Sequence, residues 1–286
     1  MSSNSTTNES ETFEIGERTV HRLGFGAMRL CGEEIVGPPA DEQTAHETLQ
    51  HAVDCGVDFI DTADSYGPGV SERLIGESIG DPDDVLVASK AGLLRNREGD
   101  WLPHGDPDYV RNQVLASRDR LRTETIDLYQ FHRPDPDTPY ADSVAAFAEL
   151  EDDGLVSAVG VSNVSVDQLE TAREQVDVAT VQNRYNVADR SNADVLEACE
   201  EAGIGFIPWA PIDADDLETH GDLLDEIADD HDATRRQVAL AWLLERSPVM
   251  LPIPGTSDPD HLESNVAASQ VSLSDAEVDR ITEAGR

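Results

Sequence analysis

Short apolar runs alternate with longer amphipathic stretches along most of the 286-residue chain. The stretches repeat apolar or small residues at spacings of three and four, which is typical of helices packed on a sheet. Alternating strands and helices of this kind build a parallel sheet. We predict eight strands, near Gly24 to Met28, Val57 to Asp61, Val85 to Lys90, Ile126 to His132, Ala158 to Asn163, Val178 to Gln182, Gly205 to Trp209 and Val249 to Ile253.

The number of strands favours a closed (β/α)8 barrel over an open doubly wound sheet. Such barrels commonly take about 250 residues in one domain. The GxGxxG sequence of many open dinucleotide-binding sheets is also absent after the first strand. A hairpin from Thr12 to His21, turning at Gly16, precedes the barrel. We expect one domain over residues 11–286 and a disordered tail over residues 1–10.

Apolar or small residues at spacings of three and four predict a helix from Asp41 to Cys55, and a second predicted helix, Pro107 to Leu121, starts with Pro after Asp. Gly56, Gly154 and Gly203 stand where helices should end before the next strand.

The chain holds 59 acidic residues against 20 Lys and Arg, a net charge of -39. This charge repels nucleic acid and anionic membrane surfaces, and in dilute salt it strains the fold by self-repulsion. At molar salt the Debye length falls to about 3 Å, which screens the repulsion. Because the acids are interleaved with apolar runs, the chain is not a disordered acidic protein. The charge therefore predicts a folded protein adapted to a very salty cytoplasm.

Cys31, Cys55 and Cys199 are far apart and have no histidines at metal-ligand spacing. We expect reduced thiols and no metal site. The chain contains no apolar run of the roughly 20 residues that cross a bilayer, and it does not begin with a signal-peptide pattern. A cytoplasmic protein without membrane partners is predicted.

Polar residues and one tryptophan end the predicted strands, where barrel active sites are built. One such residue could be a satisfied buried group or a helix cap, whereas a succession of them predicts a site. They are Asp61, Lys90, His132, Ser162, Asn163, Gln182, Trp209 and the PGTSD turn after Ile253.

Lys90 is the only lysine in the chain, beside 19 arginines. Its retention favours chemistry that needs a compact, tunable ammonium. Such a cation would lower the pKa of Tyr66, which follows Asp61 in the segment FIDTADSYG. Asp61 would hold the ammonium, and His132 could orient a substrate oxygen, giving a proton-donating site that faces a carbonyl. The alternative is a Schiff-base lysine, which requires a neutral amine.

Seven segments, in order, resemble the aldo/keto reductase superfamily over almost the whole chain: FIDTADSYG, ASK, LYQFHRP, VGVSN, QNRYN, FIPWAP and IPGTSDPDHLESN. The acidity suggests a member of haloarchaeal type. The resemblance implies NAD(P)H-dependent reduction of aldehydes or ketones by a monomer. It makes Tyr66 the general acid, Lys90 the partner that lowers its pKa, Asp61 the anchor of the lysine and His132 the orienting residue. A non-catalytic, cofactor-binding regulatory subunit is the alternative.

The resemblance also assigns cofactor contacts. Ser162, Asn163 and Gln182 would bind the nicotinamide carboxamide near Asp61, and Trp209 would stack on the ring unless it belongs to the core. The adenosine half would lie against the last segment, at Gly255, Thr256, Ser257, His261 and Asn265.

The choice between cofactors depends on that last turn. It lacks the Lys or Arg that many NADP-preferring members use, although its amides, its hydroxyls and a helix N-terminus could bind phosphate. Asp258 in this turn could equally be an N-cap. NADP(H) is favoured by the family, and NAD(H) is possible.

Substrate specificity in barrels comes from loops. The loops here are Arg29 to Ala40, Gly92 to Pro107 and Ile212 to Gly221, and Trp101, Arg95 and Arg97 could line the mouth of the pocket.

Overall fold

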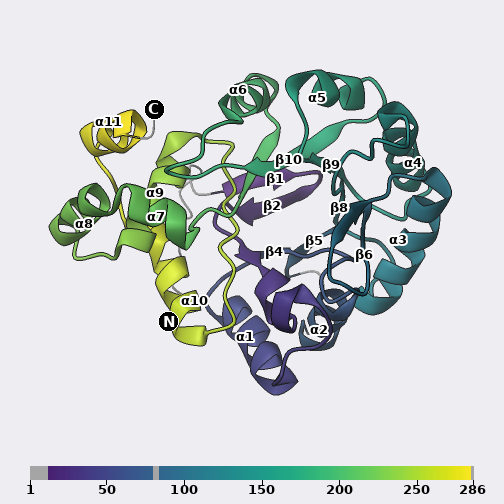
Figure 1. Cartoon of the computed structure of the whole chain (residues 1–286), viewed down its shortest axis with the longest axis horizontal. Helices are drawn as coiled ribbons and strands as arrows, with labels where there is room; N and C mark the ends of the chain where they lie inside the picture. Colours follow the sequence, from purple (N-terminus) through teal and green to yellow (C-terminus); the bar gives the residue numbers. More distant parts are fainter. Residues whose placement is uncertain (1–11, 80–83, 285–286) are drawn as a thin grey trace, which may run out of the picture.

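A computed structural model describes residues 12–79 and 84–284, and the predicted tail over residues 1–10 lies outside them. Seven parallel strands form a curled sheet in the order β11, β10, β9, β8, β5, β4, β3 (Figure 1). Every pairing in this sheet joins parallel strands, as the alternation with helices predicts. The strands are β3 (Phe25–Gly26), β4 (Phe59–Asp61), β5 (Leu86–Ala91), β8 (Leu128–Phe131), β9 (Val159–Ser162), β10 (Val178–Arg184) and β11 (Gly205–Trp209).

Helices surround the sheet (Figure 1). They are α1 (Glu42–Asp54), α2 (Val70–Ser78), α3 (Pro107–Leu121), α4 (Tyr140–Asp152), α5 (Val166–Arg173), α6 (Ala193–Ala202), α7 (Ala214–Thr219), α8 (Gly221–Asp230), α9 (Arg235–Arg246), α10 (Pro259–Val266) and α11 (Asp275–Ala284). Short 3₁₀ helices lie at Ala27–Leu30, Glu33–Ile35 and Ala267–Gln270. None of the helices among the described residues is long and apolar enough to cross a membrane.

The predicted start of α3 is confirmed, because this helix begins at Pro107 after the capping Asp106. Asp41 caps α1 by accepting hydrogen bonds from the amides of Gln43 and Thr44. Gly56, Gly154 and Gly203 have φ values of 90°, 72° and 69°, the left-handed conformation that suits glycine after a helix.

The eighth predicted strand, near Val249 to Ile253, is not a regular strand. Its backbone still bonds to both edges of the sheet: Leu251 N–H donates to Phe206 of β11, and the carbonyls of Pro252 and Pro254 accept from Gly24 and Gly26. Because a proline has no N–H, this segment can only accept hydrogen bonds at those two positions, which prevents a regular ladder. It nevertheless occupies the space between β11 and β3.

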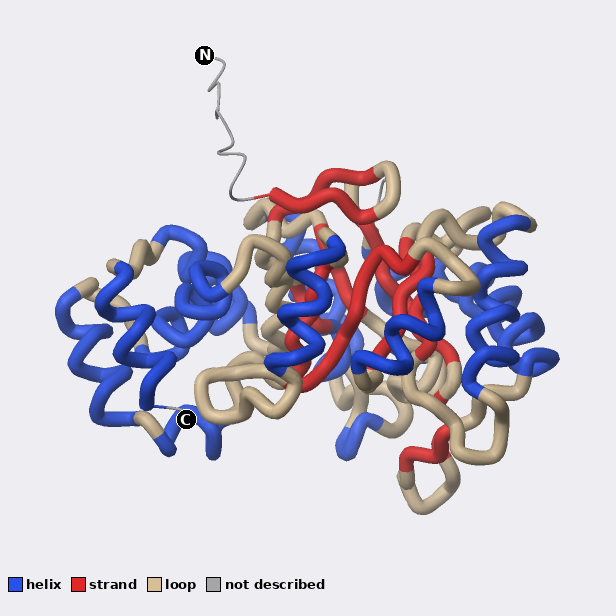
Figure 2. Tube along the Cα trace, turned by 90° about the horizontal axis from the view of Figure 1, so that it is seen from above, coloured by secondary structure: helices blue, strands red, loops and turns tan. Residues whose placement is uncertain are grey.

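The predicted N-terminal hairpin is present as β1 (Thr12–Ile15) and β2 (Arg18–His21). It lies across one end of the sheet, where the chain begins (Figure 2). Ile15 and Val20 are about 1% exposed and pack on residues inside the curled sheet, among them Phe59 and Leu128. The hairpin therefore closes the end that carries no site.

A second hairpin, β6 (Leu93–Arg95) with β7 (Trp101–Pro103), projects from the opposite end, within a segment that the sequence predicted only as a loop (Figure 2). The turn between these strands includes Gly99, whose φ is 84°.

Gly26 tests the contact between β3 and the proline segment. A Cβ at this position would stand 2.7 Å from the carbonyl oxygen of Ile253, so that this backbone would have to move. We expect Gly26→Ala to lower the free energy of unfolding by about 1–3 kcal/mol, measured by urea denaturation. An unchanged midpoint would show that the segment is not tightly held against β3.

Candidate active site

The polar residues at the strand ends lie together because side chains alternate between the two faces of each strand. Successive side chains of a strand point to opposite faces, so Asp61, Lys90 and Gln130 share the inner face with Phe59, Ala88 and Leu128, two residues earlier in β4, β5 and β8. The earlier residues form an apolar floor, and the later ones form a polar layer towards the carboxyl ends of the strands. Ser162, Gln182 and Trp209 join that layer from β9, β10 and β11.

Lys90 and Asp61 form a buried ion pair at the centre of this layer. Lys90 Nζ lies 2.5 Å from Asp61 Oδ1 and also donates to the main-chain oxygen of Thr62 at 2.8 Å. Asp61 Oδ2 accepts from the side-chain amides of Gln182 at 2.8 Å and Gln130 at 3.2 Å. Burial alone would lower the pKa of Lys90, but Asp61 and then Tyr66 outweigh it, so the pKa is raised and the amine stays an ammonium.

Tyr66 lies over this ion pair, with its ring centroid 5.2 Å from Lys90 Nζ. Lys90 lowers the pKa of Tyr66, as predicted, but it does not set the net direction of the shift. Tyr66 is 7% exposed, and the loss of water around a phenolate raises the pKa more than the nearby Lys90 charge lowers it. The phenol therefore keeps its proton at neutral pH, and Lys90 is placed to stabilise the phenolate once that proton has left.

His132 and Trp101 complete an aromatic wall beside Tyr66. The three rings meet edge to face, with centroids 5.8 to 6.5 Å apart, and the guanidinium of Arg95 lies 3.7 Å above Trp101. Burial, Lys90 and Arg133 hold the pKa of His132 well below its ordinary value. His132 is therefore a neutral imidazole that can donate a hydrogen bond.

A pocket of about 420 Å³ opens above this layer. Lys90 is fully buried behind its lining. Thr256, Ser257, His261 and Asn265 follow on the last turn and α10, outside this pocket. The predicted site residues that do line it are Asp61, Tyr66, His132, Ser162, Asn163, Gln182, Trp209 and Gly255.

The three loops expected to shape the substrate site also reach the pocket, through Arg29, Ile35, Leu93, Trp101, Ile212 and Asp213. Neither Arg95 nor Arg97 lines the pocket, although the Arg95 guanidinium packs on the Trp101 ring.

The residues predicted to bind the nicotinamide amide are fixed by hydrogen bonds at the pocket rim. Asn163 donates from Nδ2 to the main-chain oxygen of His132 at 3.0 Å, and its Oδ1 accepts from Trp209 Nε1 at 3.1 Å. Its φ of 58° is a left-handed conformation that Asn tolerates better than most residues. Ser162 Oγ donates to the main-chain oxygen of Gln182 at 2.7 Å. These bonds fix the rim of the pocket.

The last turn has the expected helix N-terminus. Asp258 accepts from the amides of Asp260 and His261 and is the N-cap of α10, as the alternative reading of this residue predicted. Asn265, 3% exposed, has a buried side-chain nitrogen with no hydrogen-bond partner among the described residues. A buried amide without an acceptor is costly, so Asn265 is suited to contact a bound polar molecule.

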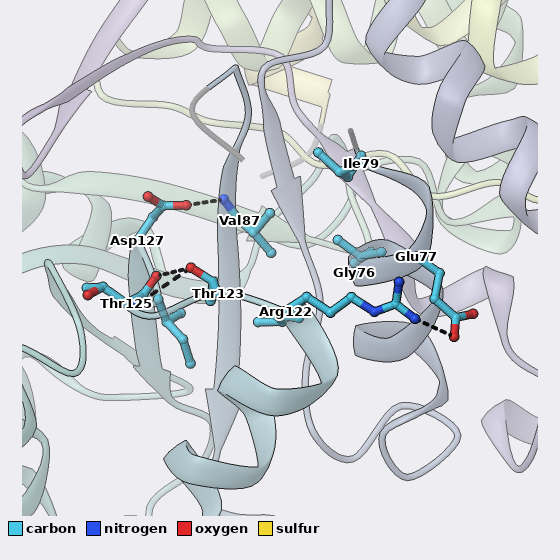
Figure 3. A pocket seen from close by; sticks show the side chains of 11 residues that line it. Gly76, Glu77, Ile79, Val87, Arg122, Thr123, Thr125 and Asp127 are labelled. Atoms are coloured by element: carbon cyan, nitrogen blue, oxygen red, sulfur yellow. Dashed lines mark hydrogen bonds and ion pairs between the residues drawn. The ribbon is translucent and has the colours of Figure 1, made fainter. Parts of the chain in front are cut away.

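A second cavity, of about 310 Å³, lies at the opposite ends of β5 and β8 (Figure 3). Its charged groups are already engaged: Glu77 accepts from Arg122 at 3.1 Å, and Asp127 accepts from the amide of Val87 at 2.9 Å. It lies away from the Lys90 layer and contains none of the predicted site residues.

Sequence reasoning missed three residues at the site. Gln130 sits within the run LYQFH, which reads as a buried strand, and only strand alternation shows that it faces Asp61. Arg133 directly follows His132 and lines the pocket, and Arg184 lies 5.1 Å from the Trp209 ring, held by ion pairs with Asp216 and Asp189.

Comparison with known proteins identifies the class. Residues 22–286 match the model of the aldo/keto reductase family. An uncharacterised oxidoreductase of Schizosaccharomyces pombe is 43% identical over 97% of this chain and 91% of its own length. Pyridoxine 4-dehydrogenase of Escherichia coli is 36% identical over 93% of this chain and 95% of its own length.

Solved structures of aldo-keto reductases are also similar to this chain. A thermostable aldo-keto reductase in complex with the inhibitor epalrestat is 30% identical, with a TM-score of 0.84 over 96% of this chain and 99% of that one. An aldo-keto reductase from Klebsiella pneumoniae in complex with NADPH is 26% identical, with a TM-score of 0.81 over 96% and 94%. The chain belongs to the aldo/keto reductase family. It is an NAD(P)-dependent oxidoreductase that reduces carbonyl compounds.

Lys90→Arg tests whether the site needs an ammonium rather than any cation. A guanidinium is larger than the fully buried space between Asp61 and Thr62, and it cannot reproduce both short contacts. We expect steady-state carbonyl reduction to fall by about 100-fold or more. Arg111→Lys, on the surface, is the control and should leave activity unchanged. Full activity of Lys90→Arg would contradict this role.

Proposed function

We propose that the protein reduces an aldehyde or ketone to an alcohol with NADPH, using Tyr66 as the general acid. The observation that carries this proposal is the buried ion pair of Lys90 and Asp61, 2.5 Å apart and directly beneath the Tyr66 ring. This arrangement keeps a permanent cation next to a protonated phenol in a water-poor site.

Tyr66, Lys90 and His132 each have a separate role in the transfer of one proton to the substrate. NADPH, when bound, supplies the hydride that reduces the carbonyl carbon. Tyr66 donates its proton to the carbonyl oxygen, and Lys90 stabilises the phenolate that remains until solvent returns a proton. Neutral His132 donates a hydrogen bond that aims the carbonyl oxygen at Tyr66. Trp101 limits the access of water on the same side.

The cofactor residues follow the family resemblance. Ser162, Asn163 and Gln182 would hold the nicotinamide amide, and Trp209 would cover one face of the ring. Gly255 lines the pocket, and a Cβ there would stand 2.7 Å from the Gly26 carbonyl, so this turn packs closely against β3. The adenosine half would bind at Thr256, Ser257, His261 and Asn265.

NADPH is proposed over NADH on two grounds. The family uses NADP(H), and the structurally similar Klebsiella pneumoniae protein was solved with NADPH. The N-terminus of α10 and the hydroxyls of Thr256 and Ser257 supply neutral donors for a 2′-phosphate. NADH is the alternative, since Asp258 and His261 replace the cations that many NADP-preferring members use.

The remaining expectations belong to the same proposal. Residues 11–286 would form one domain, a closed (β/α)8 barrel in which the proline segment takes the eighth place, and the protein would act as a monomer. Three free cysteines, Cys31, Cys55 and Cys199, support a reducing cytoplasm. The net charge of -39 supports adaptation to molar salt of haloarchaeal type.

Two other functions fit less well. Schiff-base chemistry needs a neutral amine, whereas Asp61 raises the pKa of Lys90 and occupies its nitrogen. Borohydride trapping of a carbonyl compound on Lys90 would support it nonetheless. A non-catalytic regulatory subunit would have no need of the complete set of Asp61, Tyr66, Lys90 and His132.

Tyr66→Phe tests the general acid. The variant keeps the ring and its packing but loses the proton, so kcat with NADPH and an aromatic aldehyde should fall by about 100- to 10,000-fold. The dissociation constant of NADPH, followed by quenching of tryptophan fluorescence, should change little. Turnover equal to that of the wild type would exclude Tyr66 as the donor.

Salt dependence tests the adaptation. Self-repulsion of the surface carboxylates should be screened in concentrated KCl, so the thermal unfolding temperature should rise by several degrees between dilute buffer and molar KCl. Sucrose at equal osmolality does not screen charge and serves as the control. A flat response to KCl would argue against salt adaptation.

A further inference from the structure

Arg29 and Arg133 line the pocket without a partner among the described residues, in a chain of net charge -39. Most other arginines bind carboxylates, as Arg120 does with Glu72 at 2.6 Å. Arg29 and Arg133 make no hydrogen bond, ion pair or ring contact with any residue in the described part of the chain. Both guanidinium groups are therefore without a carboxylate partner in the described part of the chain.

The other charges of the pocket are already engaged. Asp61 binds Lys90, and Asp213 caps α7 by accepting from amides of its first turn. Arg184 is held by Asp189 and Asp216, at 2.8 and 2.6 Å. The charge left to meet a ligand in this pocket is therefore positive.

Arg133 lies at the reacting end of the pocket. It directly follows His132, and its charge contributes, after burial and Lys90, to the lowered pKa of that histidine. Asp135 does not neutralise it, because that carboxylate accepts from Thr138 and from the amides of Gly105 and Asp137. Arg133 is half-buried, and its guanidinium has no hydrogen-bond acceptor among the described residues.

Arg29 lies elsewhere in the pocket. Its Cγ is 3.7 Å from the place where a Cβ on Gly255 would stand, and its side chain is exposed. It therefore borders the turn proposed for the cofactor, whereas Arg133 adjoins His132. The two cations face different parts of a bound pair of ligands.

We propose that Arg133 binds an anionic group of the substrate, so that the enzyme prefers carbonyl compounds that also carry a carboxylate or a phosphate. This inference rests on the proposed reductase function. A guanidinium presents two parallel N–H donors that match either anion. Because Arg133 is the neighbour of His132, the anion and the carbonyl would sit in one small substrate, separated by a few bonds.

The test compares aldehydes of nearly equal shape, in the same KCl concentration and with saturating NADPH. They are 4-carboxybenzaldehyde, its neutral methyl ester and 4-formylphenyl phosphate. The wild type should show the higher kcat/KM for the carboxylate or the phosphate, and the better of the two identifies the anion. In Arg133→Gln the ratio of anionic to neutral kcat/KM should fall about 10- to 100-fold, mainly through KM.

Arg97→Gln, at an arginine that does not line the pocket, is the matched control and should leave that ratio unchanged. A wild type without preference for either anion, or a ratio that Arg133→Gln does not alter, would overturn the inference while leaving the reductase function intact.

If the protein is not a reductase, none of the three aldehydes will be turned over. Calorimetric titration with benzoate then tests the anion site by itself. Benzoate binding that Arg133→Gln weakens would support the site, and absence of benzoate binding to the wild type would exclude it.

Discussion

The buried contact between Lys90 and Asp61 is the interaction on which the site depends. Removing two charges from water is costly, and here the cost is offset because each charge has further partners: the Thr62 oxygen for the ammonium, and the amides of Gln130 and Gln182 for the carboxylate. These groups come from β4, β5, β8 and β10 or follow them directly, so the strand register sets the geometry. Rigid strands thereby support chemistry that loops would hold less well.

Much of the fold could be predicted from the sequence because periodicity and end signals are local properties. The hairpin from Thr12 to His21 and the start of α3 at Pro107 match the structure. The eighth strand was read from its apolar run alone, and Pro252 and Pro254 prevent a regular ladder there. The β6–β7 hairpin was missed because its three-residue strands carry too short a pattern to distinguish them from a loop.

The sequence predicts those site residues that stand at the ends of apolar runs. Asp61 and Lys90 are two of them, and the structure places them in contact. The direction of the Tyr66 pKa could not be read in this way, because it depends on how completely the ring is buried, which is a property of the packed loops. Gln130 and Arg133 were missed because their roles depend on which face a strand turns inward and on which carboxylates remain unpaired.

The protonation state of Lys90 decides whether a permanent cation lies beneath Tyr66, and the composition makes it measurable. Since this is the only lysine, protein labelled with ¹³C-lysine gives a single side-chain Cε signal, whose shift reports the charge on the neighbouring nitrogen. We expect an ammonium signal that does not titrate from about pH 6 to pH 10, near the ordinary lysine pKa. A signal that titrates near neutral pH would mean a neutral amine, and would contradict a permanent cation beneath Tyr66.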